Sequence, residues 1–310
     1  MERCGIPGTF IAWPDVLHEG PTPLTTGDEW IQVRSAYLAS GGYPSLDEIL
    51  DRYHKVDADL ESYADHEEVV FWFEHDLFDQ LLLIRHLWWL GARGATAATR
   101  FSLVCGDQYL GLLREDGFPP LFEARRPITA EQTAIGTRAW QAFTAADPSG
   151  LLPLASADHP GLPFLRAALR RHLEEFPAAA NGLARSERQI LQVLSEGLRT
   201  PEEAFVEAAR LEDHIFMGDS SFWTIVRRLA EGPRPLVAAH VELRPGRLPS
   251  GTLALTADGA AVLAGRADHV ALNGIDRWRG GVRLTSERVW RWNPGSSTLK
   301  FSPSRLPPAS

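Results

Sequence analysis

Carboxylate and imidazole side chains gather at two places in this sequence, each directly after an apolar segment. The first group follows the apolar run at 69–73 and consists of Glu74, His75, Asp76, Asp79 and Gln80. The second group follows Trp13 and consists of Asp15, His18 and Glu19. Imidazole and carboxylate groups bind divalent metals, and a pair of them whose pKa values differ can act as general acid and base.

These types of residue suggest distinct roles at one site. Glu74 and His75 are the leading acid–base or metal-ligand pair, because burial of unpaired polar groups beside a buried strand is costly. The full set of catalytic candidates is Glu74, His75, Asp76, His18, Glu19 and Asp15. The candidates for contacts with a ligand are Trp13, Asp79, Gln80 and Asp107. The candidate ligands of a divalent metal are His18, His75 and Asp76. Their spacing does not indicate which metal would bind.

Each candidate also has a structural interpretation. Asp76 suits the N-cap of a helix, where a carboxylate is favoured by the helix dipole. The His75 ring could bond a backbone carbonyl, and the loop rich in Gly and Pro can leave His18 and Glu19 in water. An aspartate such as Asp107 is common in turns.

The surrounding pattern predicts an α/β domain. The apolar run 69–73 predicts a strand buried on both faces, and 77–90 predicts a buried helix. Further strands are expected at 9–13 and 101–105, with helices at 28–39 and 45–63. Strands that alternate with helices favour a parallel, Rossmann-like sheet, and ligands of such sheets bind outside the carboxyl ends of the strands.

The second half of the chain predicts different architecture. The order from 186 to 270 is three helices, two strands and a helix, which fits a winged helix, and Trp278, Trp290 and Trp292 belong to a terminal hairpin that they anchor. The expected domains are an α/β ligand-binding domain at 1–126, a helical connector at 127–181, and a winged-helix-like domain with the hairpin at 182–301.

Composition narrows the class of protein. A chain of 310 residues with a net charge of −9 is long enough for a large core and is too acidic for general coating of nucleic acid. The only cysteines are Cys4 and Cys105, and no apolar run is long enough for a membrane span, so we expect a cytoplasmic protein without a membrane partner. Walker A, dinucleotide-binding and nucleophile-elbow motifs are absent.

Two motifs carry a resemblance to a family. At 13–21 (Trp-Pro-Asp-Val-Leu-His-Glu-Gly-Pro) and 71–80 (Phe-Trp-Phe-Glu-His-Asp-Leu-Phe-Asp-Gln), the chain resembles the bacterial domain of unknown function 1835. The resemblance implies an architecture and no established reaction. Members generally begin with an additional strand and a polar loop before the segment that corresponds to 5–8, and this sequence departs from them there. We therefore expect a sheet without its first strand.

These observations lead to two hypotheses. The preferred one is an intracellular hydrolase or group transferase that acts on a small polar ligand, with a divalent metal as the candidate cofactor. The alternative is a ligand-sensing regulatory protein whose segment 182–270 binds DNA or a protein partner. Acidic residues nearly cancel Arg227, Arg228 and Arg234 there, which disfavours nucleic acid. The sequence does not determine the substrate or the oligomeric state.

Overall fold

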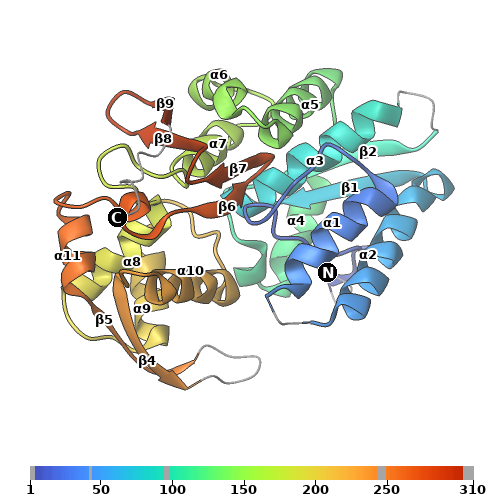
Figure 1. Cartoon of the computed structure of the whole chain (residues 1–310). Helices are drawn as coiled ribbons and strands as arrows, with labels where there is room; N and C mark the ends of the chain where they lie inside the picture. Colours follow the sequence, from blue (N-terminus) through green and yellow to red (C-terminus); the bar gives the residue numbers. More distant parts are fainter. Residues whose placement is uncertain (1–3, 42–43, 94–97, 243–248, 303–310) are drawn as a thin grey trace. The chain divides into compact units, whose positions relative to one another are not determined.

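The described chain consists of two compact units (Figure 1). The computed structural model describes residues 4–41, 44–93, 98–242 and 249–302. The first unit contains the residues up to Leu169 together with Gly280–Val282, and the second contains Arg170–Arg279 and the residues from Arg283 onward. The boundary falls inside helix α7 (Leu165–Leu173).

A three-stranded sheet forms the centre of the first unit. Strand β1 (Glu68–Phe73) pairs in parallel with β2 (Arg100–Cys105), and the two-residue strand β3 (Arg126–Pro127) pairs antiparallel with β2. The parallel pair of β1 and β2 agrees with the expected parallel pairing, but the antiparallel β3 makes this small sheet a mixed one. Because the strand order is β1-β2-β3, β1 lies at an edge of the sheet.

The predicted strand at 9–13 is wrong. This segment has no ladder partner in the structure, and Ile11 within it is 40% exposed. Its composition suits a strand, but a strand is stabilised by cross-strand hydrogen bonds and side-chain pairs, which this segment does not make with β1. A cavity lies between the two instead.

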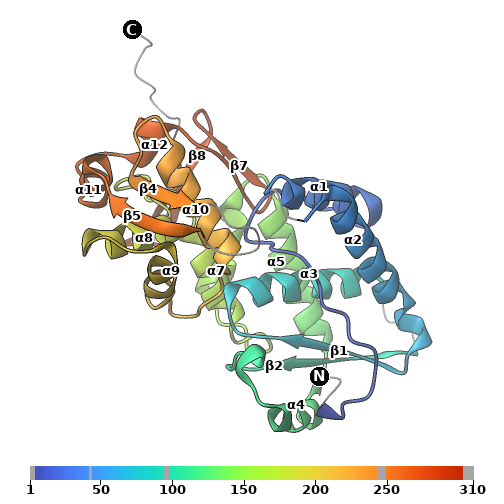
Figure 2. The same ribbon diagram turned by 90° about the horizontal axis from the view of Figure 1, so that it is seen from below.

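Helices cover both faces of this sheet (Figure 2). Phe71 and Phe73 point to the face covered by α3 (Leu77–Arg93), where both rings contact His86. Trp72 points to the opposite face and stacks on Phe122 of α4 (Phe118–Glu123), at 6.4 Å between ring centroids. Successive side chains of a strand alternate between faces, so β1 is covered on both.

The other helices of the first unit are α1 (Gly27–Ala39), α2 (Leu46–Glu61), α5 (Ala130–Thr144) and α6 (Leu151–Ser156). A capping box begins α2, since the Glu48 amide donates to Ser45 Oγ and the Ser45 amide donates to the Glu48 carboxylate. Helix α5 packs on α3, and at their closest approach Gly136 leaves room for Leu87.

The second unit follows the predicted order of elements. It contains α8 (Arg185–Ser195), α9 (Pro201–Ala209), α10 (Asp219–Glu231), β4 (Val237–Glu242), β5 (Ser250–Leu255) and α11 (Ala257–Leu263). Strands β4 and β5 pair antiparallel, and one hydrophobic core joins all these elements through residues such as Leu191, Phe222, Val226 and Leu253.

The rest of the second half consists of α12 (His269–Asn273) and two hairpins, β6 (Asp276–Arg279) with β7 (Val282–Thr285) and β8 (Val289–Asn293) with β9 (Thr298–Ser302). Buried Trp292 anchors the second hairpin, because its amide donates to Pro177 O and its carbonyl accepts from the Ala179 amide. Among the described helices, none is both long and apolar enough to cross a membrane.

Candidate functional site

The turn between β1 and α3 is ordered by its own carboxylates. Asp76 caps α3, because its Oδ1 accepts the Asp79 amide at 3.1 Å. Asp79 Oδ2 in turn accepts the Glu74 amide at 2.8 Å, and Glu74 Oε1 accepts the amide of Leu110, in the loop after β2, at 2.6 Å. Each carboxylate therefore satisfies a backbone amide at the carboxyl edge of the sheet.

The same bonds bring three acidic side chains together. One carboxylate oxygen from each of Glu74, Asp76 and Asp79 lies within 4.8 Å of the other two. Burial, together with the negative charges of Asp76 and Glu74, raises the pKa of Asp79 to about 7, although the Glu74 amide opposes the shift. Asp79 thus changes protonation state near neutral pH.

This arrangement suits a divalent cation. Two ligands of one Ca²⁺ can lie at most about 5 Å apart, since each Ca–O distance is about 2.3–2.6 Å, and the limit for Mg²⁺ is about 4 Å. The three carboxylates fall inside the first limit. Of the predicted metal ligands, Asp76 belongs to this group, whereas His18 and His75 do not belong to any such group of the described residues.

Asp79 also borders a cavity of about 1050 Å³. The cavity runs along β1, and its wall includes Trp13, Phe78 and His86. Burial and the nearby Arg85 lower the pKa of His86 to about 3, so its ring is neutral. Asp79 is therefore the predicted site residue that combines access to a cavity with a pKa near 7.

The neighbouring polar residues face other partners. The buried His75 ring lies 4.7 Å from the Tyr109 ring and 5.9 Å from the Phe164 ring. Gln80 Nε2 donates to Glu74 O at 2.7 Å and lies 3.4 Å from Cys105 Sγ. Burial raises the pKa of the Cys105 thiol to about 11, which leaves it protonated and a poor nucleophile at neutral pH.

The second predicted group surrounds a buried arginine. Asp15 forms an ion pair with Arg34, at 2.6 Å between Oδ1 and Nη2, and both side chains are fully buried. Arg34 also donates to the carbonyls of Val16, Glu19 and Pro21, so it fixes the loop that carries His18. This ion pair gives Asp15 a structural role outside the carboxylate group.

His18 and Glu19 lie near the start of α3. The His18 ring is 6.1 Å from the ring of Phe78, and its Nε2 is 3.7 Å from Glu19 Oε1. The Tyr37 hydroxyl donates to Glu19 Oε2 at 3.1 Å. The structure thus brings the loop with His18 beside the first turn of α3, but neither His18 nor Glu19 is among the residues that line the cavity, and Asp107 is exposed after β2.

Two buried arginines were not predicted from the sequence. Arg34 and Arg85 lie in helices among apolar residues, a position that gives no signal of a buried cation. Arg85 lies over the rings of Trp13 and Trp30, at 4.3 and 4.6 Å from the centroids, and burial lowers its pKa to about 10. Trp13 therefore contacts a cation of the protein itself, besides lining the cavity.

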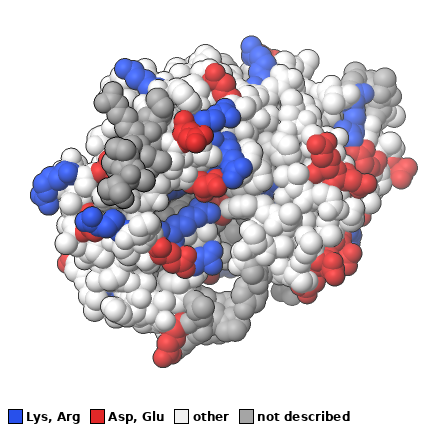
Figure 3. Space-filling model, in the orientation of Figure 1, with Lys and Arg blue, Asp and Glu red and all other residues white. Residues whose placement is uncertain are grey.

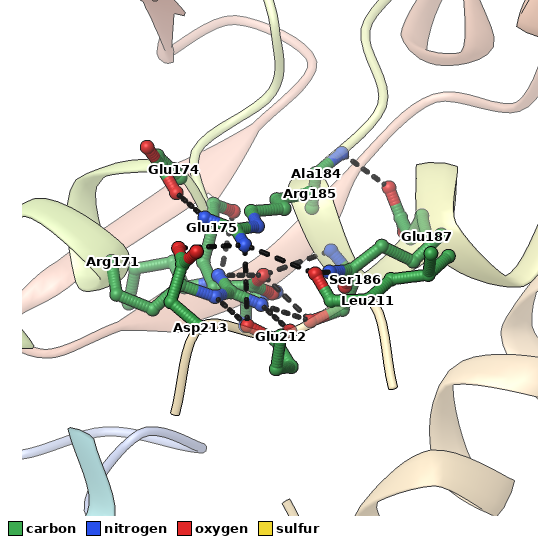
Figure 4. Close-up of polar contacts among 12 residues, drawn as sticks. Arg171, Glu174, Glu175, Ala184, Arg185, Ser186, Glu187, Leu211, Glu212 and Asp213 are labelled. Carbon is green, nitrogen blue, oxygen red and sulfur yellow. Dashed lines mark hydrogen bonds and ion pairs between the residues drawn. The ribbon is translucent and has the colours of Figure 1, made fainter. Parts of the chain in front are cut away.

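A second polar cluster lies within the second unit (Figure 4). Arg171 bonds Glu175 and Glu212 at 2.7 Å each, and Arg185 bonds Glu174 at 2.7 Å. Opposite charges compensate each other throughout, which is the pattern of a structural ion-pair network.

Comparison with protein-family models, with curated proteins and with solved structures found no match for this chain.

Proposed function

We propose that this chain is an intracellular enzyme, a hydrolase or group transferase, that acts on a small polar ligand at the carboxyl edge of β1. The observation that carries the proposal is the convergence of Glu74, Asp76 and Asp79, of which Asp79 borders the cavity. Ligands of parallel sheets bind at this edge, and the loop with His18 lies next to it. The resemblance to domain of unknown function 1835 rests on the same motifs and stays a prediction.

Two kinds of chemistry fit the carboxylates. With a divalent cation bound, all three would be ionised, and the cation would supply Lewis acidity for a phosphate or carbonyl group of the ligand. Without a cation, Asp79 has the pKa that a general acid or base needs at neutral pH, because burial and the two neighbouring carboxylates disfavour its ionised form. In both cases Asp79 takes part, because it is the carboxylate of the three that borders the cavity.

Metal binding is the first test. We expect Ca²⁺, whose ligand spacing the carboxylates meet, to raise the Tm of the protein, since a cation at about 100 times its Kd stabilises the folded state by about 2.7 kcal/mol. The Tm is measured by differential scanning fluorimetry, and Kd by isothermal titration calorimetry. The shift should vanish in Asp79→Asn and in Glu74→Gln.

Asp107→Asn is the matched control, because Asp107 follows β2 at the same edge but is exposed and outside the carboxylate group. It should retain the full shift. An equal Tm response of the wild type and Asp79→Asn would refute metal binding at this site. Hydrolytic activity toward phosphate and carboxylic ester substrates is then compared in the same variants.

The element order of the second unit favours one alternative function. Three helices followed by β4, β5 and α11 have the order of a winged helix, and such a domain could bind DNA in a ligand-sensing regulator. Arg234 is ion-paired with Asp258 and Arg227 lies 4.0 Å from Glu231, which reduces the charge left for phosphates. Fluorescence anisotropy with labelled duplex DNA tests this alternative, and binding that weakens steeply with salt would support it.

A further inference from the structure

The cavity beside β1 has the form of a slot along an unpaired strand. All six residues of β1 line it, and no strand of the described residues pairs with this edge. Residues 6–13 line the slot as well. Phe78, Leu82 and His86 of α3 also belong to its wall, as do Phe118 and Phe122 of α4. The slot therefore follows the plane of the sheet.

The backbone of β1 presents unused hydrogen-bonding groups to this slot. The Arg100 amide donates to Glu67 O, and with the register Glu68↔Arg100 this turns the amides and carbonyls of Val69, Phe71 and Phe73 toward β2. The amides and carbonyls of the alternate residues, Val70 and Trp72 among them, then point to the opposite edge. Within a sheet such groups bond a neighbouring strand, so this edge can accept another strand.

The size of the slot matches one strand. A six-residue strand rises about 3.3 Å per residue, lies about 4.8 Å from its neighbour and occupies a sheet layer about 10 Å thick, so it fills roughly 1000 Å³. The slot measures about 1050 Å³. Phe78 and Leu82 of α3 and Phe118 and Phe122 of α4 give it apolar side chains from both helices, as around a central strand of a parallel sheet.

Charge indicates which segment would enter. The lining includes Asp59, Glu68, Asp79 and Glu115, and none of the described lining residues is Lys or Arg. Glu68 is paired with Arg125 and Asp59 with Lys55, whereas Glu115 is exposed. Figure 3 shows further carboxylates over the region that α1 and α2 occupy in Figure 1, and α2 continues into the slot through Asp59 and Leu60.

We propose that an extended segment of a partner polypeptide, apolar over about six residues and flanked by Lys or Arg, enters the slot and pairs with β1 as an added strand. The inference does not depend on metal binding or on catalysis by the carboxylates.

Hydrogen exchange on the full-length protein tests the unpaired edge. In the protein alone, the amides of Val70 and Trp72 should exchange much faster than those of Val69 and Phe71, which are bonded to β2. Addition of the synthetic peptide Lys-Lys-Val-Thr-Val-Ile-Val-Thr-Lys-Lys should protect Val70 and Trp72. Protection of these two amides in the protein alone, or fast exchange in the saturated complex, would overturn the proposal.

Fluorescence anisotropy with the labelled peptide tests the pairing and the charge. N-methylation of every second peptide amide, in the register that faces β1, should abolish binding. Replacement of the four lysines by glutamates should weaken binding about tenfold at low salt. Glu115→Gln should reduce the difference in affinity between the lysine and glutamate peptides. Glu131→Gln, at an exposed glutamate outside the slot, should leave this difference unchanged.

Two outcomes would identify another occupant and overturn the proposal. Concentration-dependent dimerisation that protects Val70 and Trp72 would assign the slot to a second copy of the chain. Binding of the N-methylated peptide with unchanged affinity would mean that the slot takes apolar side chains without strand pairing.

Discussion

The buried ion pair of Asp15 and Arg34 shows how one residue can fix a whole loop. Replacement of Arg34 by Met leaves the Asp15 carboxylate buried without its cation and leaves three loop carbonyls without their donor. We expect a loss of about 3–5 kcal/mol in the free energy of unfolding, measured by urea titration. Lys55→Met, which breaks the exposed Lys55–Asp59 pair, should cost less than about 1 kcal/mol.

The raised pKa of Asp79 predicts how the stability of the protein depends on pH. Because the pKa of its carboxyl is raised to about 7 in the folded state, the folded state holds this proton more tightly than the unfolded state does. In the absence of metal, the contribution of Asp79 to the stability of the first unit should therefore decrease as the pH rises from about 4 to about 8.

Asp79→Asn keeps an oxygen acceptor for the Glu74 amide and removes the charge. We expect it to raise the free energy of unfolding by about 1–2 kcal/mol at pH 8 and to have little effect at pH 4, after allowance for solvent screening. Urea titrations at the two pH values measure the difference. Destabilisation at pH 8 would contradict the raised pKa.

At the scale of elements, the contact between α3 and α5 depends on a glycine. A Cβ at Gly136 would lie 2.4 Å from Leu87 Cβ, which belongs to the rigid base of that side chain. Gly136→Ala should therefore cost about 1–3 kcal/mol, despite the higher helix propensity of alanine. Gly111→Ala, where a Cβ meets nothing within 4 Å, is the matched control, and thermal unfolding compares the two.

The elements also show what sequence patterns can predict. The apolar run of β1 and the long helix after it were predicted from their continuous apolar pattern, although burial is complete only on the face of β1 that carries Phe71 and Phe73, and Trp72 on the other face is half-buried. The segment 9–13 carries the same local preference, yet whether it pairs depends on a neighbouring strand edge, which local sequence does not encode. Asp76 and Asp79 were predicted at the site, whereas the cavity and the partner of Asp15 arise from tertiary packing.

At the scale of the whole molecule, the second unit should be sensitive to acid. Burial alone would raise the pKa of Glu175, but Arg171 and Arg279 outweigh it and keep this pKa well below its ordinary value. Arg277 and His269 lower the pKa of Glu187 against the effect of burial. A carboxyl group whose pKa is lower in the folded state stabilises the fold at pH values above its pKa in the unfolded state. This stabilisation is lost as the pH falls toward the pKa of the folded state.

We therefore expect the second unit to lose about 2–4 kcal/mol between pH 6 and pH 3. Hydrogen exchange of the α8 amides, converted to free energies of opening, measures the loss in this unit alone. Equal opening free energies at both pH values would show that these ion pairs contribute nothing to its stability.

The first unit is discontinuous along the chain. Gly280 O accepts the Thr22 amide and the Gly281 amide donates to Phe143 O, while a Cβ at Gly281 would collide with Thr144 O. A gene fragment that ends after α7 would lack this closing piece, with two buried backbone partners lost. Expression of the amino-terminal half alone should therefore yield an incompletely folded product that proteases cleave readily. A stable fragment of the first unit would need residues 280–282 joined to its carboxyl end by a short designed linker.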